Sequence, residues 1–344
     1  MVQKDTSTVR LELDLDQPGT SFGRIALAQS TNISAWGELH IPVVSINGGD
    51  GPTVLLCGGT HGDEYESQLF LLRLVEELDP TAVTGRILVI PRLSGAASSE
   101  GTRLWPDGTN LNRAFPGDPN GSVPSRLADF MTRVLFPLAD AVIDVHSGGR
   151  SMSFAPMATI HVPEDRELRR AMLAAASAWI TDLCYVQLFA ADGAGLLNEE
   201  AQHQGRIVAT AELGGAAMVS VETLAVAERG VTNLLRHLGV LEGAPRSRTD
   251  LGLPPTQYVE IAGPANYLRA RDRGLFEPRV APGTAVSAGQ VVGTMRFPDH
   301  PDRPSEDLLS PYTGVVCVVR AMPASEIGDC LIVVGRVIDI DAVA

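Results

Sequence analysis

The chain has 344 residues, of which 44% are hydrophobic and 20% charged, so it suits about two globular domains and is neither a disordered tail nor a coiled coil. Lys and Arg number 27 against 41 Asp and Glu, and the resulting net charge of −14 argues against nucleic acid or an anionic membrane as the main partner. The single lysine, Lys4, excludes Schiff-base and P-loop chemistry from the rest of the chain.

The cysteines and the N-terminus indicate a reducing compartment. Cys57, Cys184, Cys317 and Cys330 are scattered without a C-x-x-C pair, which is typical of buried thiols and not of disulfides or a zinc ribbon. Residues 1–16 lack the apolar core of a signal peptide, and no run approaches the roughly 18 apolar residues of a membrane helix. We therefore expect a soluble cytoplasmic protein.

The expected elements begin with three short alternating segments, residues 9–15, 22–28 and 40–46, which predict an antiparallel lead-in. From residue 53 onward, continuous apolar runs alternate with helical stripes, a pattern that predicts an α/β sheet covered on both faces. The predicted strands are 53–57, 86–90, 141–145, 184–189 and 206–213, and the predicted helical stripes are 71–78, 168–179 and 224–238.

A second pattern begins after the polar, Pro- and Gly-rich segment 243–255, which we interpret as a linker. Beyond it, residues 280–293 and 310–319 each show a Gly turn followed by short Val-rich alternation and no helical stripe. This predicts a C-terminal all-β region of barrel-sandwich type. We expect a domain of residues 1–245 followed by a β domain of residues 246–344.

Two motifs bear histidines at predicted strand ends. The sequence Gly58-Gly59-Thr60-His61-Gly62-Asp63-Glu64 follows the strand at 53–57, with His61 and Glu64 three residues apart where a helix opens. His146 ends the predicted strand at 141–145 and precedes two glycines. Each motif alone is more often a helix cap or a structural histidine. Together, on parallel strands, they supply two imidazoles and a carboxylate with an open fourth position, as in catalytic zinc sites.

Two further segments could complete such a site. Residues 101–118 form a predicted loop with two arginines, and a guanidinium held near a metal suits a carboxylate or a developing oxyanion; solvated Arg–Asp pairs are an equal alternative. Glu212 ends the apolar strand at 206–213, where poor solvation should raise its pKa toward the range of a general base. A carboxylate that caps the next helix is the alternative for Glu212.

The motifs G-G-T-H-G-D-E, N-L-N-R-x-F-P-G, D-x-H-S-G-G and E-L-G-G, in this order over residues 40–245, resemble the succinylglutamate desuccinylase/aspartoacylase family of zinc-carboxypeptidase-like enzymes. The resemblance implies a mixed sheet flanked by helices and one zinc ion per subunit. By this likeness His61, Glu64 and His146 match the zinc ligands, and Glu212 matches the glutamate that activates water.

The resemblance also implies how substrate is held. Asn112 and Arg113 match the pair that grips the free carboxylate of the substrate, and Arg103 is similar to the arginine that polarises the scissile carbonyl. The likeness is nearest to the ectoine-degrading branch, which implies deacetylation of Nα-acetyl-L-2,4-diaminobutyrate. This substrate has a side-chain ammonium group, so we expect a carboxylate of the protein to bind it. The candidates are Asp192, Glu199 and Glu200, although a solvated helix start is the favoured interpretation of these three residues.

Other assignments stay open at this point. Another N-acyl amino acid deacylase or a metallocarboxypeptidase would use the same metal set, and a metal-free pseudoenzyme is disfavoured because every candidate ligand is present. A lipoyl-type carrier fails because no lysine follows Lys4. The expected partner is a small N-acyl amino acid, and nothing in the sequence excludes a homo-oligomer. The remaining histidines, including His161, are interpreted as surface or structural residues.

Overall fold

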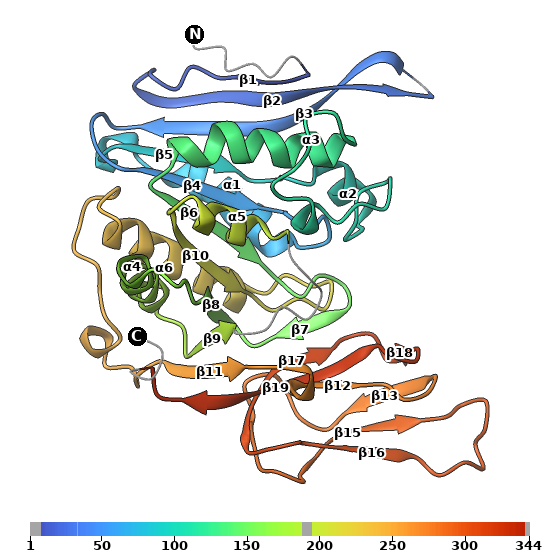
Figure 1. Cartoon of the computed structure of the whole chain (residues 1–344). Helices are drawn as coiled ribbons and strands as arrows, with labels where there is room; N and C mark the ends of the chain where they lie inside the picture. Colours follow the sequence, from blue (N-terminus) through green and yellow to red (C-terminus); the bar gives the residue numbers. More distant parts are fainter. Residues whose placement is uncertain (1–7, 33, 188–194, 341–344) are drawn as a thin grey trace.

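One large mixed sheet runs through the protein (Figure 1). The computed structural model describes residues 8–32, 34–187 and 195–340. Within this described part of the chain the sheet has fifteen strands, and its main order is β1-β2-β3-β5-β4-β6-β10-β8-β9-β11-β19-β17-β14. The α/β class predicted from alternating strand and helix patterns is confirmed.

The predicted N-terminal lead-in is an antiparallel meander. It consists of β1 (Val9–Glu12), β2 (Gly19–Thr31) and β3 (Ser34–Asn47). The meander joins the central sheet where β3 pairs antiparallel with β5 (Arg86–Ile90). The long β2–β3 hairpin lies along one side of the molecule in Figure 1.

The centre of the sheet is parallel and carries the site. Strands β5, β4 (Thr53–Gly58), β6 (Ala141–His146) and β10 (Ile207–Glu212) all run in the same direction. Every residue of β4 and β6 is buried, because helices and loops cover both faces and apolar side chains can point either way. Parallel pairing places the carboxyl ends of these strands at one edge.

Beyond β10 the direction changes. Strand β8 (Met157–His161) pairs antiparallel with β10 and parallel with β9 (Leu183–Gln187). Strand β8 was not predicted, because its five residues have neither a long apolar run nor a flanking motif. The short β7 (Met152–Phe154) lies just before it and pairs with a C-terminal strand, β17.

The three predicted helical stripes are confirmed. They form α1 (Tyr65–Glu77), α4 (Arg166–Ala178) and α6 (Val221–His237), and α6 packs against both α1 and α4. N-caps explain where two of these helices begin. At α4 the Asp165 carboxylate accepts a hydrogen bond from the amide of Leu168, and at α6 Ser220 and Thr223 form a capping box. The shorter helices are α2 (Gly95–Glu100), α3 (Val123–Phe130) and α5 (Leu197–His203). Figure 1 shows α3 and α5 in front of the sheet.

The region after residue 256 is β-rich, as expected. Its strands are β11 (Gln257–Ile261), β12 (Tyr267–Arg269), β13 (Gly274–Pro278), β14 (Ala285–Val286), β15 (Val291–Arg296), β16 (Glu306–Leu309), β17 (Gly314–Arg320), β18 (Ala324–Ser325) and β19 (Cys330–Ile338). Strands β16-β15-β13-β18 make a separate antiparallel sheet. In Figure 1 these strands lie below the helical layers.

The two regions are joined by main-chain hydrogen bonds. Strand β11 pairs parallel with β9 on one side and antiparallel with β19 on the other, so the large sheet continues into the C-terminal region. The main hydrophobic core draws on residues 9–241, and a second core on residues 270–334. The division near residue 245 stays a prediction. Among the described residues, no helix is long and apolar enough to cross a membrane.

Candidate metal centre and cavity

Three predicted site residues meet at the carboxyl edge of the parallel strands. Glu212, the last residue of β10, lies directly opposite His146, the last residue of β6. On the other side of β6, Val145 lies opposite Gly58, the last residue of β4, and His61 follows three residues later. The parallel register therefore brings these segments together, although they are far apart in the sequence.

Glu64 lies between the two imidazoles. Its Oε1 is 2.7 Å from Nδ1 of His61, and its Oε2 is 2.8 Å from Nδ1 of His146. The Ser147 amide also donates to Oε2 at 3.2 Å. All three predicted ligands are at most 4% exposed, and one ligand atom from each lies within 4.8 Å of the others. The predicted convergence of His61, Glu64 and His146 is thus present in the fold.

The loop before α1 gives Glu64 its orientation. The helix begins at Tyr65, one residue after Glu64, so His61 and Glu64 precede the helix that was expected to carry them. Glu64 occupies the N-cap position, yet its side chain makes no capping bond and turns toward the histidines. Gln68 fixes the loop by donating to the Glu64 carbonyl at 2.9 Å. A Cβ on Gly62 would lie 2.4 Å from the backbone of Ala97, so only glycine allows this close approach.

The charges at this centre are strongly coupled. Burial raises the pKa of Glu64, but His61 and His146 more than offset it and hold this pKa well below its ordinary range. Burial lowers the pKa of His61, which favours the neutral imidazole that a metal requires. Burial also lowers the pKa of His146, but the carboxylates of Asp144 and Glu64 outweigh it and raise this pKa well above its usual value.

Asp144 contacts the ring nitrogen of His146 that does not face Glu64. Its Oδ2 is 2.8 Å from Nε2 of His146, at an angle that suits an ion pair rather than an aligned hydrogen bond, and its Oδ1 accepts the Thr60 hydroxyl at 2.7 Å. The carboxylate is fully buried in β6. Asp144 therefore fixes the ring orientation of a candidate ligand, a common arrangement around metal-binding histidines. The D-x-H spacing, two residues apart on one strand, was the available signal for this partner.

Glu212 lies beside this set as a poorly solvated acid. Burial raises the pKa of its carboxyl to about 8, and Glu64 adds to this rise while His146 opposes it. Among the described residues, Glu212 Oε2 has no hydrogen-bond partner. The shift predicted from its position at a strand end is confirmed in direction. A carboxyl with such a pKa can exchange a proton near neutral pH.

The loop of residues 101–118 brings the other predicted residues to the centre. Arg103 Nη1 donates to Glu64 Oε1 at 3.1 Å, and its side chain is 42% exposed. Asn112 lies in the short 3-10 helix Leu111–Arg113, with Nδ2 3.5 Å from Nε2 of His146. The Asn112 Oδ1 accepts the amide of Leu197 at 2.8 Å, so only its NH₂ group faces the centre. Arg113 follows directly and lines the same hollow.

A cavity of about 490 Å³ opens over these residues. The α/β region before residue 245 contributes His61, Glu64, Arg103, Asn112, Arg113, His146 and Glu212, while strands of the C-terminal region contribute Tyr267, Arg269, Val318, Cys330 and Val333. Tyr267 of β12 is hydrogen-bonded to Tyr185 of β9, which also lines the cavity, and this bond crosses between the two regions. The C-terminal strands therefore form one wall of the hollow.

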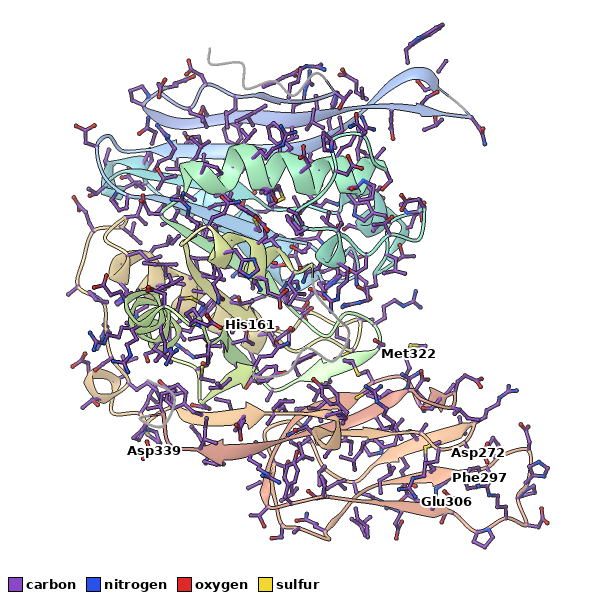
Figure 2. The ribbon with its side chains drawn as sticks, viewed as in Figure 1. His161, Asp272, Phe297, Glu306, Met322 and Asp339 are labelled. Atoms are coloured by element: carbon purple, nitrogen blue, oxygen red, sulfur yellow. The ribbon has the colours of Figure 1, made fainter. Side chains whose placement is uncertain are left out.

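Sequence reasoning missed other cavity residues. His161, interpreted above as a surface or structural residue, ends β8 and lines the cavity, and Asn198 of α5 does so as well. In the view of Figure 2 the half-buried His161 is labelled above the C-terminal strands. Neither position carries a motif, because the antiparallel insertion of β8 beside β10 cannot be recognised from local sequence. Asp192, one of the acidic candidates, lies outside the described residues.

The donor set fits a divalent transition metal. Two imidazoles and a carboxylate are donors that zinc prefers, and they are buried with a cavity on one side, as a catalytic site requires. Among the described residues, Nε2 of His61 has no hydrogen-bond partner, so this buried nitrogen has no alternative role in the fold. The geometry therefore offers a metal site with an open face.

Residues 50–238 match the succinylglutamate desuccinylase/aspartoacylase catalytic domain. The chain belongs to this family. It is 36% identical to the N-alpha-acetyl-L-2,4-diaminobutyric acid deacetylase of Halomonas elongata, over 98% of this chain and 97% of that protein. The membership confirms the resemblance drawn from the four ordered motifs.

Solved structures of family members share the whole fold. The product-bound ectoine utilization protein EutE (DoeB) of Ruegeria pomeroyi has a TM-score of 0.90 at 32% identity, covering 96% of this chain and all of that one. A succinylglutamate desuccinylase/aspartoacylase of Rhodobacter sphaeroides has a TM-score of 0.91 at 34% identity, covering 97% of this chain and all of that one. The C-terminal β region is therefore part of the shared architecture.

Proposed function

We propose that the chain is a zinc-dependent deacylase that hydrolyses Nα-acetyl-L-2,4-diaminobutyrate to L-2,4-diaminobutyrate and acetate. The observation that carries the proposal is the buried convergence of His61, Glu64 and His146 beside Glu212, under a cavity. The substrate assignment draws on the similarity, over nearly the full length, to the Halomonas elongata deacetylase.

His61, Glu64 and His146 would hold one zinc ion per chain. When bound, zinc supplies Lewis acidity, which polarises a carbonyl oxygen and lowers the pKa of water to about 7. Glu64 contributes the only negative charge among the three ligands. Asp144 keeps the ring of His146 in its binding orientation.

Glu212 moves the proton of the reaction. Its carboxylate accepts a proton from water while the water oxygen forms a bond to the acyl carbon. It then delivers that proton to the amide nitrogen as the C–N bond breaks, which releases the amine and the carboxylic acid. The acid gives up its remaining proton, so that at neutral pH the products are a carboxylate and an ammonium group. A raised pKa keeps this carboxyl close to the pH at which both transfers occur.

The arginines and Asn112 orient the substrate. Arg103 is placed to stabilise the negative charge that develops on the scissile carbonyl oxygen, since it already neighbours Glu64. Arg113 and the NH₂ group of Asn112 are placed to bind the free α-carboxylate, so that the amide next to that carboxylate is the one presented.

A second candidate is a deacylase for an acidic amino acid. The observation that favours it is the presence of three guanidinium groups along one cavity, those of Arg103, Arg113 and Arg269. A substrate with two carboxylates would suit them. A peptide substrate is less well supported, because C-terminal strands close one wall of a hollow of about 490 Å³.

A substrate panel tests the proposal. Zinc-loaded and chelator-treated protein would be assayed with Nα-acetyl-2,4-diaminobutyrate, N-acetylaspartate, N-succinylglutamate and short peptides. We expect the zinc form to prefer the diamino substrate, and Glu212→Gln to lower kcat about 10²- to 10⁴-fold with zinc retained. The exposed Glu222 of α6 supplies the control Glu222→Gln. Absence of turnover on every acyl amino acid would refute the proposal.

A further inference from the structure

A buried acceptor without a partner lies in the cavity. Asn198 is 5% exposed and lines the cavity from the first turn of α5. Among the described residues its Oδ1 has no hydrogen-bond donor. A buried amide oxygen that remains unpaired costs about 1–3 kcal/mol, so an unpaired acceptor on a residue that lines a cavity indicates a ligand with an N–H or O–H group.

His161 lies in the same cavity and is close to charges of both signs. Burial lowers the pKa of this imidazole, while the carboxylate of Glu199 raises it and the guanidinium of Arg113 lowers it. A neutral imidazole keeps one nitrogen as an acceptor. The cavity therefore has a second acceptor, whose charge state responds to the carboxylate of Glu199 and to the guanidinium of Arg113.

The fold holds these residues beside Arg113. The Leu197 amide donates to Asn112 Oδ1 at 2.8 Å, and the Phe115 amide donates to the Gly195 carbonyl at 3.2 Å. A Cβ on Gly195 would lie 2.7 Å from the Arg113 carbonyl oxygen, so the segment before α5 packs directly on this residue. The positions of Asn198 and Glu199 are thereby fixed relative to Asn112 and Arg113.

We propose that Asn198 and His161, with Glu199 close to the imidazole, form a subsite for a primary ammonium group on a short amino acid side chain. The inference rests on the proposed function and names the residues that would recognise the side chain of its substrate. An ammonium group has three N–H donors, and Asn198 Oδ1 and the imidazole nitrogen can each accept one. Glu199 supplies the compensating negative charge.

The charges around the subsite match a diamino acid. Arg113, His161 and Asn198 line the cavity, and Glu199 is the residue after Asn198 on α5, whereas the substrate has an α-carboxylate and, a few bonds away, an ammonium group. An aspartyl or glutamyl side chain would instead bring a carboxylate to the unpaired Oδ1 acceptor of Asn198 and to the charge of Glu199. Such like-charge contacts give discrimination as well as affinity. This subsite thus favours a cationic side chain in spite of the arginines elsewhere in the cavity.

The test compares two substrates that differ only in the ammonium group. Nα-acetyl-2,4-diaminobutyrate and Nα-acetyl-2-aminobutyrate would be assayed with the zinc-loaded full-length protein, and selectivity would be taken as the ratio of their kcat/KM values. We expect Asn198→Leu and Glu199→Gln each to lower this ratio about 10- to 100-fold, since each removes an interaction with a charged group. Asn198→Asp keeps an acceptor and should retain the preference.

Glu200→Gln is the matched control. Glu200 is the next residue on α5, and its Oε1 accepts Gln204 Nε2 at 3.0 Å instead of facing the cavity. We expect this variant to leave the selectivity ratio unchanged. Calorimetry with L-2,4-diaminobutyrate and L-2-aminobutyrate gives a second measure that does not depend on turnover, and the same two substitutions should weaken binding of the diamino acid selectively.

The outcomes separate the two proposals. If the wild-type protein hydrolyses the diamino substrate but Asn198→Leu and Glu199→Gln leave selectivity and product binding at the level of Glu200→Gln, the subsite is wrong and the proposed function stands. Equal losses on both substrates would show a structural role and would also overturn the subsite. If the wild-type protein hydrolyses neither substrate, the proposed function fails, and the subsite fails with it.

Discussion

The metal end of the cavity and its C-terminal wall are built in different ways. At the metal end, Glu64 is buried, and both of its oxygens contact a histidine and one further donor. The C-terminal wall carries the exposed Arg269 and the half-buried Tyr267 and Cys330 beside buried valines. One region holds concentrated charge with little freedom, and the other gives the cavity its shape.

This difference determines how each region responds to substitution. A buried charge with fixed partners cannot relax when one partner is removed, so the cost is large. A half-exposed side chain can be replaced by water or by a shifted neighbour. We therefore expect changes at the metal end to abolish metal binding or chemistry, and changes in the wall to alter affinity and stability moderately.

The largest effect is expected for Glu64→Gln. The substitution removes the negative charge between two imidazoles, so zinc should be lost on dialysis. We expect kcat to fall at least about 100-fold, the equivalent of about 3 kcal/mol of Lewis-acid stabilisation. Metal analysis and steady-state kinetics would measure both. The exposed Glu77 of α1 provides the control Glu77→Gln. Retention of one zinc per chain would contradict the assigned ligand set.

A smaller effect is expected for Asp144→Asn. The amide keeps the size of the side chain but loses the charge that orients His146, and zinc affinity should fall about 10- to 100-fold while some activity remains at saturating zinc. Competition with a chelator would give the affinity. Asp140→Asn, at the exposed residue just before β6 begins, should leave the zinc affinity unchanged. Equal affinities for Asp144→Asn and the wild type would remove Asp144 from the metal site.

Tyr267→Phe tests the C-terminal wall. Loss of the hydroxyl breaks the bond to Tyr185, and we expect about 1 kcal/mol less stability and a change in kcat/KM within about fivefold. Tyr258→Phe is the matched control, because its hydroxyl lies 3.0 Å from that of Ser177 and Tyr258 does not line the cavity. A loss of activity as large as that of Glu64→Gln would erase the distinction between the two regions.

The smallest effect concerns pH and His161. Because burial lowers the pKa of His161 in the folded state, the unfolded chain binds a proton first as the pH falls below the ordinary value of 6.5. The free energy of unfolding therefore decreases as the pH falls. Urea unfolding would measure the free energy of unfolding at pH 7.5 and at pH 5.5. We expect this free energy to decrease less between the two pH values for His161→Gln than for the wild type. His300→Gln, at an exposed position, should behave like the wild type.

The central fold was predictable because its signals are local. Continuous apolar runs predict β4, β6 and β10 since both faces of these strands are buried, and stripes at helical spacing predict α1, α4 and α6. Glycines after a strand indicate a turn at the sheet edge. The convergence of His61, Glu64 and His146 then follows from the parallel direction of the strands.

The cavity beyond the metal end was not predictable in the same way. His161 reaches it because β8 inserts between β10, to which it runs antiparallel, and β9, to which it runs parallel. Asn198 reaches it because Asn112 holds the start of α5. Both conditions are long-range contacts that leave no periodic trace in the sequence. The beginning of α1 was also misplaced, because the carboxylate of Glu64 binds histidines instead of capping the helix.

The pairing of β11 with both β9 and β19 has a consequence for how substrates enter. A ladder of main-chain hydrogen bonds ties the C-terminal strands to the sheet whose edge carries the candidate metal site, so these strands cannot swing aside without breaking several bonds at once. The C-terminal wall of the cavity is consequently a fixed part of the sheet, and we expect broader substrates to require a different wall rather than a moving one.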